Sequence, residues 1–133
     1  MIPASPGENE SEEPPSYALR MTPRAVSDMD AAYAHLVGTA SVEIADDWKE
    51  SLLDAIAGLA LMPHRQAVPE AARFKRPVRQ IIHQRPGSRV AYRVLFWVLE
   101  GSLDGPVVTT LALRHGAAKP ITRAEAREIE ASE

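Results

Sequence analysis

The sequence predicts an α+β protein in which a helical hairpin packs on one face of an antiparallel sheet. Apolar residues recur at intervals of three and four between residues 23 and 59, which is the spacing of amphipathic helices. In three later segments apolar and polar residues alternate, as they do in strands. Because each helix has a single apolar face, both are expected on the same side of the sheet. The length of 133 residues and the hydrophobic content of 45% suit one domain.

The first half of the domain predicts one short strand and two helices. Residues 17–21 alternate between apolar and polar types, which indicates a strand. Thr22 and Pro23 then have the residue types favoured at the N-cap and at the first helical position. Gly38 is expected to end this helix, and Ser41 to cap a second, longer one. The apolar stripe of the second helix consists of Ala45, Trp48, Leu52, Ile56 and Leu59.

The second half predicts three antiparallel strands and a short helix. The strands are expected at 78–84, 89–99 and 107–114. Thr122 and Glu125 have the spacing of a capping box, so a short charged helix is expected at the C-terminal end. The predicted order is therefore β-α-α-β-β-β followed by a short helix.

The composition excludes several classes of function. The chain contains no cysteine, which rules out disulfides, thiolate metal sites and a cysteine nucleophile. The four histidines lack metal-ligand spacing, and no phosphate-binding or nucleophile-elbow motif occurs. We therefore expect neither a metal nor a cofactor.

The N-terminal region differs from the rest of the chain. Residues 1–16 are rich in proline, serine and glutamate, which predicts a disordered acidic leader before a domain at 17–133. We find no signal peptide and no apolar run of about 20 residues, so we expect a soluble, cytoplasmic protein without a membrane partner.

Charge is distributed unevenly along the chain. Residues 1–62 hold three Lys/Arg and eleven Asp/Glu, a net charge of −8, whereas residues 63–120 hold ten and three, a net charge of +7. The basic part either binds an anionic partner or is neutralised by the acidic helices within the fold. The candidate nucleic-acid or partner-binding residues are Arg73, Lys75, Arg76, Arg79, His83 and Arg89.

The two sides of the central strand differ in polarity. Its apolar side, which is expected to meet the helices, consists of Val90, Tyr92, Val94, Phe96 and Val98. On the opposite side we expect an open basic surface that gathers Arg79, His83, Arg93 and His115. As alternatives, Arg93 could pair with an acidic residue on a neighbouring strand or cover Trp97, and His115 could bond to the backbone at its strand end.

Four segments carry a family resemblance: YALRMTPRAVSDM, PVRQI, YRVLFWV and VVTTLALRHGAAKP. In this order they resemble the RelE/ParE family of bacterial type II toxins, over about Tyr17 to Pro120. The resemblance implies the RelE/ParE-like two-layer fold and a growth-inhibiting toxin of the plasmid-stabilisation type. It also implies a cognate antitoxin whose tail wraps the sheet and the helical hairpin.

The family has two branches with different targets. RelE-like members cut mRNA in the ribosome; here Arg93 would stabilise developing charge, His115 would be the acid or base, and Arg79 would bind phosphate. ParE-like members act on DNA gyrase without a recognised nuclease site. The segment LALRHGAAKP is more similar to ParE, and the paired lysines of some nucleases are absent from the second sheet strand. We therefore favour a ParE-like toxin; the alternatives are a ribosome-dependent endoribonuclease and a non-toxic binding module.

Overall fold

The computed structural model describes residues 16–101, 103 and 105–132. The elements are β1 (Ala18–Met21), α2 (Pro23–Thr39), α3 (Val42–Ala57), η1 (Gly58–Ala60), η2 (Ala71–Arg73), β2 (Arg79–Gln84), β3 (Ala91–Leu99), β4 (Val107–His115) and α4 (Arg123–Ala131). The expected order of helices and strands is confirmed. The predicted leader lies, except for Ser16, outside the described residues.

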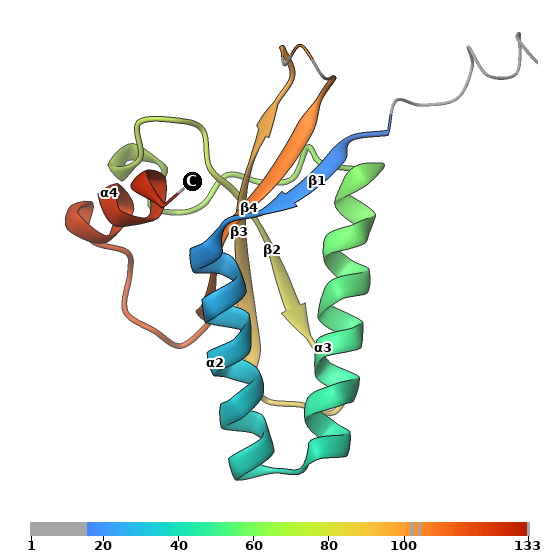
Figure 1. Ribbon diagram of the computed structural model, residues 1–133. Coiled ribbons are helices and arrows are strands. Elements are labelled where there is room, and N and C mark those ends of the chain that lie inside the picture. The colour runs from blue at the N-terminus through green and yellow to red at the C-terminus, as the bar shows by residue number, and fades with distance from the viewer. Residues whose placement is uncertain (1–15, 102, 104, 133) are drawn as a thin grey trace, which may run out of the picture.

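The four strands form one mixed sheet in the order β1-β4-β3-β2 (Figure 1). Strand β3 pairs antiparallel with both β2 and β4, as expected, whereas β1 pairs with β4 in parallel. The pairing of β3 with β4 shifts between Leu95 and Phe96. This irregularity changes which residues of β4 face each side of the sheet.

Helices α2 and α3 form the expected hairpin on one side of the sheet (Figure 1). The hydroxyl of Thr22 accepts a hydrogen bond from the backbone of Ala25, and Ser41 caps α3 in the same way. The expectation that Gly38 ends the first helix is wrong. Helix α2 continues to Thr39, and Ala40 leaves the helical conformation instead.

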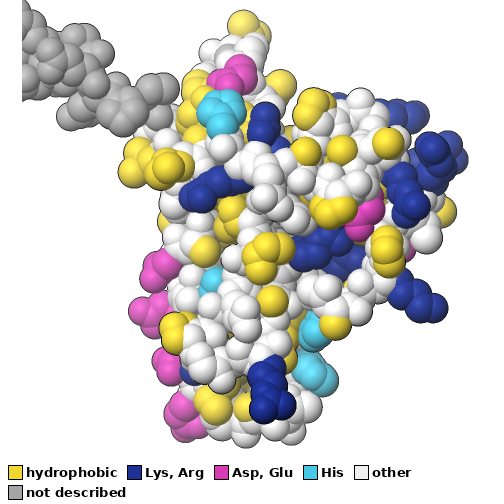
Figure 2. All heavy atoms as spheres, turned by 180° about the vertical axis from the view of Figure 1, so that it is seen from behind, with side chains coloured by type: hydrophobic (Ala, Val, Ile, Leu, Met, Phe, Trp, Pro, Cys, Tyr) yellow, Lys and Arg dark blue, Asp and Glu magenta, His cyan; other side chains and the backbone are white. Residues whose placement is uncertain are grey.

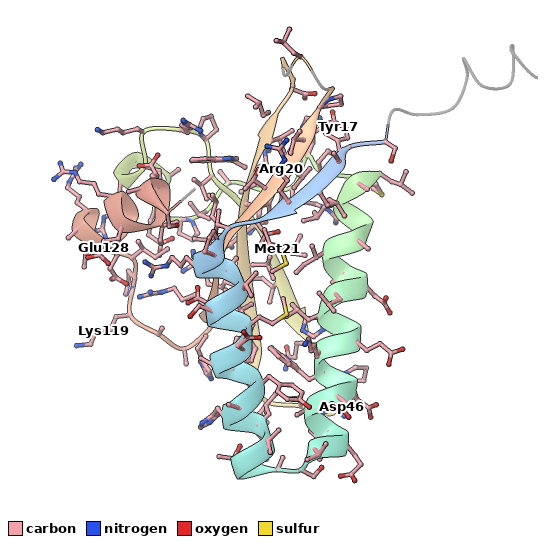
Figure 3. All side chains as sticks on the ribbon, viewed as in Figure 1. Tyr17, Arg20, Met21, Asp46, Lys119 and Glu128 are labelled. Carbon is pink, nitrogen blue, oxygen red and sulfur yellow. The ribbon has the colours of Figure 1, made fainter. Side chains whose placement is uncertain are left out.

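The apolar side of β3 packs against this hairpin, as the alternation predicted. Tyr92 and Val94 form a buried cluster with Trp48 and Leu52 of α3. Figure 3 shows Met21 at the end of β1, directed into the space between the two helices and the sheet. The hairpin is therefore held by a continuous apolar core on one face.

The opposite face of the sheet is covered by the chain itself. Leu95 and Trp97 of β3 pack in a second core with Phe74 of the loop and with Ala126 and Ile129 of α4. The expectation of an open basic face is therefore wrong. A short, charged helix closes this face because its residues Ala126 and Ile129 are buried in the second core.

Replacing Ile129 by alanine tests how firmly α4 is held. Ile129 is only 1% exposed, so we expect Ile129→Ala to lower the free energy of unfolding by about 2–4 kcal/mol. Ile82→Ala is the matched control, because Ile82 is 55% exposed and its loss is expected to cost less than about 1 kcal/mol. Urea denaturation followed by circular dichroism measures both. Equal effects of the two substitutions would mean that α4 does not pack as described.

Candidate functional site around a buried arginine

A cavity of about 600 Å³ opens on the side of the sheet away from the hairpin. Figure 2 views the molecule from behind, and dark-blue basic atoms are visible in the hollowed centre of this face. The lining residues are Pro69, Glu70, Ala72, Arg73, Gln80, Arg93, Gly116, Ala118 and Pro120. The cavity thus joins the loop before β2, the sheet and the segment that leads to α4.

Arg93 lies at this cavity in an ion pair with Glu70. Its Nη1 and Nη2 atoms donate to the two carboxylate oxygens at 3.0 and 2.7 Å, and Nε donates to Gln80 at 2.8 Å. The side chains of Arg93 and Glu70 are only 11% and 6% exposed. The backbone N–H of Ile121 also donates to Glu70, at 3.0 Å. Arg93 therefore pairs with a carboxylate, which comes from a loop and not from a neighbouring strand.

Hydrogen bonding from Arg93 lowers the pKa of Glu70 to about 2. Burial acts in the opposite direction, and the backbone N–H of Ile121 adds to the lowering. The carboxylate consequently stays ionised at every physiological pH. The positive charge of Arg93 is compensated within the fold, so little of it remains for an incoming phosphate.

His115 does not lie beside Arg93. In the sheet, His115 pairs with Tyr92 and Arg93 pairs with Arg114, so the side chains of Arg93 and His115 are on opposite faces. The Nδ1 atom of His115 accepts the backbone N–H of Ala117 at 3.0 Å, which is the backbone bond considered as the alternative. The expectation that the two candidate catalytic residues share a surface is therefore wrong, and their catalytic roles stay predictions.

Arg79 and His83 also lie on the hairpin side of the sheet. His83 pairs with Tyr92, whose side chain contacts the helices, and its Nε2 is 2.8 Å from the hydroxyl of Ser51. Burial, with a smaller contribution from Arg85, lowers the pKa of His83, so the buried ring favours its neutral form. Arg79 donates from Nη1 to the carbonyl of Arg65. Neither residue lies beside Arg93, because both point to the other face of the sheet. The prediction failed because the strand register could not be fixed from the sequence alone.

The remaining candidate binding residues are exposed. Arg89 lies in the turn between β2 and β3. Arg73 donates to the carbonyl of Ile121, next to α4. The guanidinium of Arg76 lies 4.2 Å from the ring centroid of Trp97, so the cation that covers this tryptophan is Arg76 and not Arg93.

Two residues of the site were not predicted from the sequence. Glu70 is the only acidic residue between Pro63 and Leu99, and its isolation within a basic segment was a signal for an ion pair. Arg114 is bound by Glu125 of α4 at 2.8 Å. No sequence pattern links Arg114 to Glu125, because the two residues meet only through the packing of α4.

Two further observations concern the described part of the chain. It contains no group of three or more His, Cys, Asp or Glu side chains arranged to hold a metal ion. None of its helices combines the length and apolar character needed to cross a bilayer.

The ion pair predicts an asymmetric response to mutation. Glu70→Gln leaves the buried Arg93 without a counter-charge, so we expect the free energy of unfolding to fall by about 3–5 kcal/mol. The double variant Glu70→Gln/Arg93→Gln removes both charges and is expected to recover at least half of that loss. Denaturant unfolding of the two single variants and the double variant measures the coupling. Additive effects would show that the two side chains do not interact.

The same pair predicts a loss of stability in acid. An unfolded chain protonates Glu70 near its ordinary pKa of 4.5, whereas the folded protein does so only near pH 2. The stabilisation is therefore complete above about pH 5 and decreases by about 3 kcal/mol as the pH falls to 2. Unfolding free energies measured across this range should fall more steeply for the wild type than for Glu70→Gln/Arg93→Gln. Parallel curves would contradict the prediction.

Comparison with known proteins agrees with this fold. A family model described as "ParE toxin of type II toxin-antitoxin system, parDE" matches residues 19–120. A search of curated proteins finds no significant match. A solved structure described as "Chromosomal ParDE TA system from P. aeruginosa" has 21% sequence identity and a TM-score of 0.54, and the match covers 75% of this chain and 96% of that chain. Because the family model spans most of the sequence, the chain belongs to the ParE toxin family of type II toxin–antitoxin systems.

Proposed function

We propose that the protein inhibits bacterial growth by acting on DNA gyrase and that a cognate antitoxin neutralises it. The observation that carries this proposal is the ion pair between Arg93 and Glu70. In the RelE-like nucleases, the arginine that Arg93 matches must present its charge to a phosphate. Here that charge is bound within the fold, which favours the ParE-like branch.

The surroundings of Arg93 support the same choice. The three residues of β2 on its side of the sheet are Gln80, Ile82 and Gln84, none of which is a cation. A proton-transfer group must lie within hydrogen-bond reach of the reacting atoms, and His115 is on the other face. The cavity therefore lacks the combination of an available charge and a nearby acid or base that a nuclease mechanism requires.

The helical hairpin offers a surface for the antitoxin. Val26 of α2 is 44% exposed, and Val42 and Leu53 of α3 are 49% and 40% exposed. Large apolar side chains exposed on paired helices are suited to the apolar face of a partner segment. We propose that an antitoxin segment covers them, as the family resemblance implies for the hairpin.

Induction of the protein alone tests its target. We expect growth arrest, DNA breaks and inhibition of supercoiling by purified gyrase, while transcripts stay intact. The variant Glu70→Gln/Arg93→Gln, once shown to be folded, is expected to keep more than about half of the gyrase inhibition, because both side chains act structurally.

Rapid transcript cleavage that is lost in the double variant would instead establish the ribonuclease mechanism. Normal growth with intact DNA would show a binding module without toxicity. Gyrase inhibition, transcript sequencing and growth curves from the same induction therefore separate the three functions.

A further inference from the structure

The loop that contains η2 runs beside α4 and places basic residues of both segments together. Arg73 donates to the carbonyl of Ile121, just before α4 begins. Lys75 and Arg127 line a common hollow near the end of α4, together with Glu130 and Ala131. Arg123 and Arg127 are four residues apart, so they project from the same side of the helix. The basic residues of this region are Arg73, Lys75, Arg76, Arg123 and Arg127, here called the α4 cationic surface.

The carboxylates of α4 are engaged elsewhere. Glu125 binds Arg114 of β4 at 2.8 Å. Glu128, labelled on α4 in Figure 3, has its Oε2 atom 3.8 Å from Nη1 of Arg24 in α2. The carboxylate of Glu130 accepts the backbone N–H groups of Lys75 and Arg76 at 3.1–3.2 Å. These contacts join α4 to β4, to α2 and to the loop before β2.

Three cations of the α4 cationic surface face solvent without a carboxylate partner among the described residues: Lys75, Arg123 and Arg127. Lys75, Arg123 and Arg127 are exposed, and within the described residues no carboxylate forms an ion pair with their side chains. Figure 2 shows dark-blue side chains gathered on the side of the molecule that carries α4, while acidic side chains line the opposite edge. An anionic partner would thus be attracted to one side of the protein.

We propose that the α4 cationic surface binds the phosphate backbone of duplex DNA. Four of its five residues are arginines, which suit phosphate because the guanidinium can donate two parallel hydrogen bonds. Arg123 and Arg127 are separated by about 6 Å along the helix axis. Phosphates recur about every 3.4 Å along the axis of each DNA strand, so both side chains can reach one strand.

The surface does not fit other polyanionic partners equally well. Trp97, the aromatic residue beside it, is 4% exposed and lies under Arg76, so it cannot stack on the bases of a single strand. Residues 71–76 and 119–131 contain none of the large hydrophobic side chains that are exposed. An apolar hollow beside them is lined by Arg76 and Leu99, at the edge of the surface and away from Arg123 and Arg127 on α4. A purely ionic surface of this kind binds the duplex backbone without reading its sequence.

This inference deepens the proposed function and rests on it for one point, which is that gyrase is the target. Gyrase holds duplex DNA, so a toxin directed at gyrase could contact the enzyme and its bound DNA together. Arg123 and Arg127 lie beyond residues 19–120, the part matched by the family model. DNA contact would therefore be a property that the C-terminal helix adds to this chain.

Binding of the full chain to a fluorescent 20-base-pair duplex tests the inference without gyrase. In anisotropy titrations from 20 to 150 mM salt, Arg123→Gln/Arg127→Gln is expected to weaken binding about tenfold at low salt. The slope of log K against log salt should become shallower by about 0.9 for each lost contact. The matched control Arg20→Gln/Lys49→Gln changes the net charge equally at β1 and α3, away from α4, and is expected to weaken binding less than about twofold.

Equal weakening by the two variants, or no binding by the wild type at 20 mM salt, would overturn the inference. The inference would also be overturned if a synthetic peptide of residues 1–15 bound the protein more tightly than the duplex does. The partner of the α4 cationic surface would then be the acidic N-terminal segment of the chain itself. Duplex binding without gyrase inhibition would disprove the proposed function alone, and gyrase inhibition without duplex binding would disprove this inference alone.

Discussion

The ion pair between Arg93 and Glu70 connects three parts of the fold that are far apart in sequence. Arg93 belongs to the central strand, Glu70 to the loop that leaves the helical hairpin, and Ile121 donates its backbone N–H to the same carboxylate. Two buried charges carry a large desolvation cost, which is offset here by a bidentate pair and the additional hydrogen bonds. The loop and the start of α4 are therefore fixed in position, and with them the second apolar core.

This constraint also determines what the cavity can do chemically. A guanidinium that holds the protein together cannot move toward a substrate without leaving Glu70 buried and unpaired, at a cost of several kcal/mol. Arg114 is held in a similar way by Glu125, so both central arginines on this face of the sheet are engaged by segments that cover it. In the cavity the charges of Arg93 and Glu70 offset each other, so the central arginine offers little charge to a phosphorane. The remaining charged residue of the lining is Arg73, which donates to the carbonyl of Ile121.

The local features of the fold were predictable, whereas the long-range ones were not. The caps at Thr22 and Ser41 and the apolar side of β3 follow from residue types and spacing, and the structure confirms them. The face of the sheet on which His83 lies depends on its pairing with Tyr92. A shift of one residue in the strand register would have placed His83 on the opposite face. The role of Glu70 depends on the path of a proline-containing loop, which no periodic pattern describes. Of the candidate residues, only Arg73 and Arg93 line the cavity, whereas His83 and His115 lie on the other face of the sheet. Their functional roles stay predictions.

The two explanations of the charge asymmetry each apply to a different part of the molecule. Near the sheet, acidic residues neutralise the basic ones: Glu70 binds Arg93, and Glu125 binds Arg114. At the surface beside α4, Glu130 accepts the backbone N–H groups of Lys75 and Arg76. Within the described residues, the exposed side chains of Lys75, Arg123 and Arg127 form no ion pair with a carboxylate. Since screening by salt acts over about 8–10 Å, a compensated interior has little influence on a partner that approaches from solution. In our proposal, Lys75, Arg123 and Arg127 attract the phosphate backbone from solution, even though the chain as a whole has a net charge of −3.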